Sequence, residues 1–196
     1  MTFRLGLTGS IGMGKSTTAQ MFADEGCAVW DADAAVARLY GPDGEATDKI
    51  SEIWPDVVTS DGVDRAKLRD LIRSSEDILP RLEAIVHPLV RADRAAFSNL
   101  QTNILVFDIP LLFETGAETE MDAVACVSVP KEVQRQRVLA RGTMSEADLT
   151  AILVRQMPND EKCARADFVI QTDTLEHARA QVQTIVRSIR DRLNHA

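Results

Sequence analysis

The chain has 196 residues, 45% of them hydrophobic and 27% charged, which predicts one globular domain with a proper core. Its formal net charge of −8 opposes general binding to a nucleic-acid backbone, so we expect no nucleic-acid partner. No apolar run approaches the roughly 18 residues of a membrane span, and the N-terminus lacks a signal-peptide pattern. We therefore expect a cytoplasmic protein without a membrane partner.

The first predicted elements are a strand, a helix and a second strand. Residues 3–8, FRLGLT, form a short apolar run that indicates a buried strand. A glycine-rich loop follows, then a segment with apolar residues at helical spacing that ends at Gly26. Residues 27–31, CAVWD, indicate the second strand. Strand, helix and strand in such a short span predict a parallel sheet.

The loop itself, LTGSIGMGKST, matches a phosphate-binding loop, with Gly9, Gly14, Lys15 and Ser16 at the required spacing. Glycines allow the backbone amides to converge on an anion at the start of the following helix. The ammonium group of Lys15 then reaches the outer phosphates, and the hydroxyl of Ser16 is a ligand for Mg²⁺. The pattern predicts that the loop binds the phosphates of a nucleotide together with Mg²⁺.

Two acids, Asp31 and Asp33, follow the second strand, at the sheet edge where ligands bind in α/β folds. On an extended segment their side chains would point the same way. One could accept or orient the proton of an attacking hydroxyl while the other braces the loop or the metal. Asp33 could instead cap the next helix. Because a phosphate-binding loop precedes them, we favour a catalytic Asp33.

The middle of the chain predicts a helical insert, and the remainder returns to strands. Helical patterns cover 32–40, 65–73, 76–86 and 88–99, separated by turn clusters such as GPDGE and TSDGVD. Strand-like runs cover 103–110, 122–129 and 167–172, and an amphipathic helix covers 174–193. Asp108 lies near the end of one such strand, either close to the metal or as a strand-end acid that faces water or caps a turn.

Residues 130–165 are rich in arginine and mostly helical, with a capping box at SEAD, residues 145–148. This segment is either a mobile arm or a solvated pair of surface helices. The cysteines, Cys27, Cys126 and Cys163, form no Cys-x-x-Cys pair, which indicates reduced thiols. The chain also lacks the Asn-Lys-x-Asp pattern with which a GTPase reads guanine.

Taken together, the motifs resemble those of the dephospho-coenzyme A kinase family in collinear order, from about residue 3 to 190. They are LTGSIGMGKST, WDADAAVARLY, LEAIVHPLV, FDIPLLFETG, RQRVLARGTMSEADLTAILVRQMPNDEK and ADFVI. The resemblance implies transfer of the ATP γ-phosphate to the 3′-hydroxyl of dephospho-CoA. It also implies an α/β P-loop kinase fold, a parallel sheet flanked by helices, with three parts. These are a nucleotide-binding core (1–32, 100–130, 166–196), a helical acceptor subdomain (33–99) and a helical lid (131–165).

By matching position, the resemblance also implies roles for individual residues. Asp33 is the catalytic carboxylate that accepts or orients the hydroxyl proton, and Arg137 and Arg141 are lid arginines that close over the phosphates. The phosphate cradle includes Gly12, Met13 and Thr17, and the acceptor pocket includes His87, Leu111 and Glu114. His87 precedes Pro88 and could instead end a helix. The chain departs from the family at QTDT (171–174), near the adenine, and at Cys163, where arginine is common.

Two other functions remain open at this point. Another small-metabolite or nucleoside-monophosphate kinase would share the scaffold but use a different acceptor. A non-catalytic nucleotide-dependent switch would bind ATP or GTP without acceptor-stimulated release of ADP. The sequence leaves the oligomeric state open.

Overall fold

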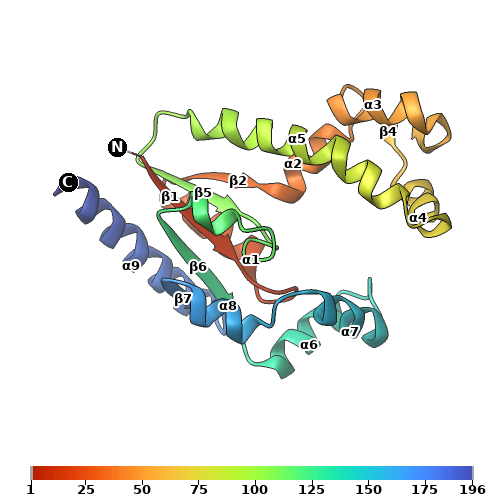
Figure 1. Ribbon diagram of the computed structural model, residues 1–196. Helices are drawn as coiled ribbons and strands as arrows, with labels where there is room; N and C mark the ends of the chain where they lie inside the picture. Colours follow the sequence, from red (N-terminus) through yellow and green to blue (C-terminus); the bar gives the residue numbers. More distant parts are fainter. Residues whose placement is uncertain (1, 196) are drawn as a thin grey trace. The chain divides into compact units, whose positions relative to one another are not determined.

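The computed structural model describes residues 2–195, and the chain divides into two compact units (Figure 1). The first unit comprises Met1–Trp30 and Gln101–Ala196, and the second comprises Asp31–Leu100.

The first unit is built on a five-stranded sheet in the order β2-β5-β1-β6-β7. The strands are β1 (Phe3–Thr8), β2 (Ala28–Asp31), β5 (Ile104–Asp108), β6 (Ala123–Ser128) and β7 (Phe168–Gln171). β1 pairs in parallel with both β5 and β6, and β6 pairs in parallel with β7. Each strand lies within two residues of its predicted ends, so the parallel sheet expected from the sequence is confirmed.

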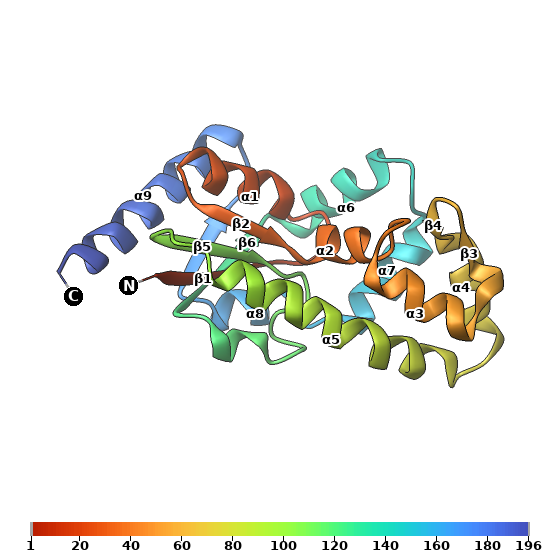
Figure 2. The same cartoon turned by 90° about the horizontal axis from the view of Figure 1, so that it is seen from above.

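Helices cover both faces of this sheet. The helices of the first unit are α1 (Lys15–Asp24), α6 (Lys131–Ala140), α7 (Glu146–Arg155), α8 (Asn159–Arg165) and α9 (Leu175–Asn194), with a short 3-10 turn, η2 (Ala117–Glu120). Of these, α1, α8 and α9 pack against the strands. Figure 2 shows α1 and α9 on one side of the sheet and α8 on the other. Phe22, Val182 and Ile189 bury their side chains against Leu5 and Leu7 of the central strand. The predicted capping box between Ser145 and Asp148 begins α7.

The second unit is helical around its own core. It contains α2 (Ala32–Leu39), α3 (Glu45–Ile53), η1 (Pro55–Val57), β3 (Val58–Thr59), β4 (Gly62–Val63), α4 (Arg65–Ser74) and α5 (Ile78–Ser98). Ile50, Leu68, Leu82, Val86 and Leu89 fill the core. The helical character predicted for this part of the chain is confirmed.

Two local predictions failed in the second unit. Helix α3 was missed, whereas the turn predicted at TSDGVD is present and connects β3 to β4. The predicted break at His87–Pro88 does not exist, because α5 runs through Pro88 without ending. Proline removes a hydrogen bond from a helix interior, but Val86 and Leu89 on either side are buried in the core, and this packing offsets the loss.

Candidate active site

The loop between β1 and α1 has the backbone of an anion-binding loop. Gly12 and Gly14 have φ values of 77° and 90°, in the left-handed region that favours glycine. Space is restricted as well: a Cβ at Gly14 would lie 2.9 Å from Oγ1 of Thr172, and one at Gly12 would lie 2.5 Å from Cγ2 of Val138. Only glycine therefore suits these two positions.

Helix α1 begins directly at this loop, with Lys15 as its first residue and Gly14 as its N-cap residue. No side chain caps the helix within the part of the chain that the structure describes. The first amides of a helix have no partner inside the helix and carry its positive dipole end. Ser16 and Thr17 are exposed in this first turn. The loop and helix together offer donors to a phosphate group.

Lys15 forms an ion pair with Asp108, the last residue of β5. The side chain of Asp108 is fully buried and that of Lys15 is 14% exposed. The strand register places Asp108 opposite Leu7, two residues before Gly9. Of the two sequence interpretations of Asp108, an acid facing water is therefore wrong.

Three polar side chains that the sequence analysis did not identify hold the loop from three elements. Asn159 of α8 accepts a hydrogen bond from the amide of Ser10 at 2.9 Å. Gln134 of α6 donates to the carbonyl of Ile11 at 2.7 Å. Thr172, directly after β7, donates to the carbonyl of Met13 at 2.6 Å. The loop is therefore shaped by side chains from distant parts of the sequence as well as by its glycines.

The predicted arginines differ in how they are held. Arg137 donates to the carbonyl of Thr172 at 2.6 Å and to its hydroxyl at 3.2 Å, so the QTDT segment links this arginine to the loop. Arg141 is exposed at the C-terminal end of α6. Arg135, which the resemblance did not assign a role, pairs with Glu146 of α7.

Glu114 and Lys162 connect the segment after β5 to α8. Lys162 is fully buried, and its ammonium group lies 2.8 Å from Oε1 of Glu114 and 2.9 Å from the carbonyl of Pro110. The same Glu114 oxygen accepts the amide of Met157 at 2.9 Å. Burial raises the pKa of Glu114, but the hydrogen bonds from Lys162 and from backbone amides outweigh it, so the pKa is lowered. Leu111, in the same segment, is 40% exposed.

The remaining predicted residues, Asp31, Asp33 and His87, belong to the second unit. Asp31 caps α2, because its carboxylate accepts the amide of Ala34 at 2.9 Å. Asp33 lies in the first turn of α2 and is exposed. The two acids are therefore not on one extended segment, and the cap is Asp31 rather than Asp33, because the chain turns helical directly after Asp31. His87 is exposed in the middle of α5.

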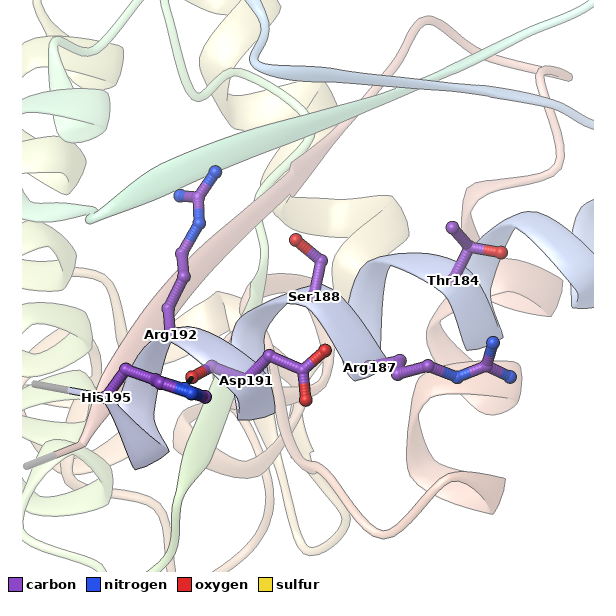
Figure 3. A pocket seen from close by; sticks show the side chains of 6 residues that line it. All are labelled: Thr184, Arg187, Ser188, Asp191, Arg192 and His195. Carbon is purple, nitrogen blue, oxygen red and sulfur yellow. Dashed lines mark hydrogen bonds between the residues drawn. The ribbon is translucent and has the colours of Figure 1, made fainter.

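One concave region of the first unit adjoins the loop. It has a volume of about 370 Å³ and is lined by Ser10 and Met13 together with residues of α6, α7 and the start of α8. Another region lies along α9 (Figure 3), and its lining includes Arg187, Asp191 and Arg192. Its six lining residues all come from the last part of the chain, and none belongs to the loop.

A parallel sheet with a glycine loop that leads from its central strand into a lysine-initiated helix defines the P-loop kinase fold. The fold class predicted from the sequence is therefore confirmed.

No helix among residues 2–195 is long and apolar enough to cross a bilayer.

Comparisons with known proteins identify the family. The family model for dephospho-CoA kinase matches residues 3–177. A dephospho-CoA kinase of Ruegeria pomeroyi is 65% identical, and the alignment covers 100% of both chains. TT1252 from Thermus thermophilus has a TM-score of 0.82 at 32% identity, over 95% of this chain and 97% of its own. The dephospho-CoA kinase from Campylobacter jejuni has a TM-score of 0.69 at 24% identity, over 96% and 98%, and shares the fold.

The chain therefore belongs to the dephospho-CoA kinase family. It is a kinase, an enzyme that transfers phosphate to a hydroxyl group.

Proposed function

We propose that the protein transfers the γ-phosphate of ATP to the ribose 3′-hydroxyl of dephospho-CoA, giving coenzyme A in the last step of its biosynthesis. The observation that carries this proposal is the family match over residues 3–177, which includes the intact phosphate-binding loop. The same assignment makes the cytoplasm the expected location, with ATP and dephospho-CoA as the partners.

On the phosphate side, the residues restrain and neutralise the triphosphate. The loop from Gly9 to Thr17 offers its amides, and Lys15 moves its ammonium group between Asp108 and the outer phosphates. Arg137 and Arg141 add positive charge, which phosphoryl transfer requires because charge accumulates on the equatorial oxygens of the transferred group. We assign 131–165, which carries these arginines, as the lid that excludes water.

Magnesium fits the oxygen ligands that this chain offers. The hydroxyl of Ser16 is exposed in the first turn of α1, and the buried carboxylate of Asp108 lies at the end of β5. Within residues 2–195 there is no group of three or more His, Cys, Asp or Glu side chains that could hold a metal. Mg²⁺ in kinases is bound largely by substrate phosphates and water, with one or two protein ligands. Ser16 would hold the ion directly, and Asp31 or Asp108 through water. When bound, the ion neutralises charge on the phosphates.

On the acceptor side, Asp33 accepts or orients the proton of the attacking hydroxyl. Its exposed position in the first turn of α2 leaves its carboxylate available for this task. The segment 33–99 is assigned as the acceptor subdomain, with His87 as one of its binding residues. Leu111 contacts the acceptor, and Glu114, already bonded to Lys162, keeps the segment around Leu111 in shape.

Formation of ADP, measured with a panel of acceptors, tests this proposal. We expect ATP consumption with dephospho-CoA and none above background with nucleosides, nucleoside monophosphates or shikimate. Preference for one of those acceptors would favour a different small-metabolite kinase. Nucleotide binding without any acceptor-stimulated ADP release would favour a switch protein.

A further inference from the structure

Two cysteines of the first unit lie close together, one in strand β6 of the sheet and the other in helix α8. The sulfur atoms of Cys126, in β6, and Cys163, in α8, lie 3.5 Å apart. Cys126 is fully buried and Cys163 is partly exposed, while neither thiol forms a disulfide. A disulfide bond needs a sulfur separation of about 2.05 Å, so a small shift of α8 toward β6 would join them.

Asn159 connects this pair of thiols to the phosphate-binding loop. It lies one helical turn before Cys163, and its Nδ2 lies 3.6 Å from the sulfur of Cys163. Its Oδ1 lies 3.9 Å from the sulfur of Cys126 and accepts the amide of Ser10 at 2.9 Å. One amide side chain therefore contacts both sulfurs and the loop, so a bond between the sulfurs must change its surroundings.

We propose that Cys126 and Cys163 are an oxidation site, at which a peroxide forms an intramolecular disulfide. This disulfide weakens the hydrogen bond between Asn159 and the phosphate-binding loop. The inference goes beyond the kinase activity, because it concerns a chemical modification of the protein itself. The proposed mechanism of the kinase assigns no role to either thiol.

The exposure of the two thiols sets the order of the steps. The Cys163 thiolate attacks a peroxide oxygen, so an S–O bond forms, the O–O bond breaks, and hydroxide leaves and is protonated to water. The sulfur of Cys126 then attacks that of Cys163, the S–S bond forms, the S–O bond breaks, and the Cys126 proton leaves with the hydroxide as water. Two thiols are oxidised by two electrons and the peroxide is reduced to water.

Cys126 is suited to the second role rather than the first. Burial, and to a smaller extent the neighbouring Cys163, raises the pKa of the Cys126 thiol, so it is a poor thiolate. The partly exposed Cys163 is the thiol that a small oxidant reaches first. Cys27 is buried in another part of the core and has no sulfur partner among the residues that the structure describes, which makes it a natural control.

The test treats the full-length protein with hydrogen peroxide and follows three readouts. We expect the free thiols to fall from three to one, and peptide mapping to find Cys126 linked to Cys163. We expect direct binding of an ATP analogue to weaken about 2- to 10-fold, since one hydrogen bond to the loop is lost, and to recover with a dithiol reductant. Because the binding assay contains no acceptor, its outcome is independent of which acceptor the kinase uses.

Matched variants decide the result. Cys163→Ser must not form the bond or lose ATP affinity with peroxide, whereas Cys27→Ser must behave like the wild type. If Cys126→Ser does not fold, Cys163→Ser and Cys163→Ala alone carry the comparison. Oxidation of Cys163 to a sulfinic acid without a disulfide, a link to Cys27 or between chains, or a disulfide that leaves ATP affinity unchanged would each overturn the proposal.

Discussion

Lys15 and Arg137, assigned to the phosphate side, differ from Asp33 and His87, assigned to the acceptor side, in how firmly their own unit restrains them. Lys15 is paired with a fully buried carboxylate, and Arg137 is bonded twice to Thr172, which in turn bonds the loop. Asp33 and His87, by contrast, are exposed on helices of the second unit. A restrained group keeps its orientation before the substrate arrives, which is how electrostatic stabilisation becomes effective. An exposed group can be replaced without loss of folding, so the two sides should respond differently to mutation.

The largest expected effect is a loss of activity without a loss of stability, on the acceptor side. Asp33→Asn should lower kcat about 10²- to 10⁴-fold, because it removes a general base. Thermal stability and ATP affinity should not change, since the side chain is exposed. The matched change, Asp31→Ala, removes the cap of α2 and should cost about 0.5–2 kcal/mol of stability. Near-normal turnover of Asp33→Asn would remove this residue from the mechanism.

Glu114, although assigned to the acceptor side, is held by the buried Lys162, so Lys162→Met should act first on folding. It leaves the partly buried Glu114 without its ion-pair partner, which should lower the free energy of unfolding by about 3–5 kcal/mol. Adding Glu114→Gln removes the unpaired charge and should restore part of that loss in a denaturant titration. No recovery in the double variant would show that Lys162 stabilises the protein by its packing rather than by its charge.

Lys15→Met should reduce kcat about 10²- to 10³-fold, the usual effect of losing one charge-stabilising donor. Because this change also leaves Asp108 buried without its ion-pair partner, a melting curve must accompany the kinetics. The double variant Lys15→Met with Asp108→Asn should fold more stably than the single variant and remain inactive. Undiminished product formation by either variant would contradict the role of the loop.

A smaller effect is expected at Thr172. Thr172→Val keeps the shape but loses the two bonds of the hydroxyl, to Met13 and to Arg137, while Arg137 keeps its bond to the carbonyl of residue 172. KM for ATP should therefore rise about 2- to 10-fold with little change in kcat. Thr184→Val provides the control, because the hydroxyl of Thr184 bonds only a carbonyl of its own helix and the residue is exposed. Equal effects of the two changes would show that the QTDT segment does not support the loop.

The smallest effect concerns acid stability. The pKa of Glu114 is lowered in the folded protein, so its ionised form stabilises folding at any pH above its ordinary value. That contribution should disappear as the pH falls through the lowered value. Between pH 5 and 3, the melting temperature of the Lys162→Met, Glu114→Gln double variant should therefore fall less steeply than that of the wild type. Equal slopes of melting temperature against pH for the two proteins would mean that Glu114 has the same pKa in the folded and the unfolded state.

Much of the first unit was predictable because its strands are short apolar runs and its loop is a specific motif. Helix α3 was not, since only Ala46, Thr47 and Ile50 of its nine residues are buried and the apolar pattern is correspondingly weak. Pro88 was expected to end a helix, but tertiary packing overrode this local rule.

The residues that brace the loop were missed for a different reason. Gln134, Asn159 and Thr172 are polar, and a polar residue that bonds a distant backbone has the same sequence pattern as one that faces water. The signals available were weak: Thr172 follows a strand at the ligand-binding edge of the sheet, and Asn159 begins a helix. By contrast, the roles of Asp33 and His87 come from the family pattern and stay predictions.

Because Thr172 lies so close to Gly14, these two positions, which are far apart in the sequence, cannot be changed independently. A methyl group at position 14 would push against the threonine hydroxyl, so any larger residue there also disturbs the anchor of Arg137. Shortening residue 172 would relieve the collision but not the left-handed backbone at position 14, whose φ is 90°. Compensation between these two positions can therefore be only partial, and position 14 is restricted to glycine whichever residue stands at 172.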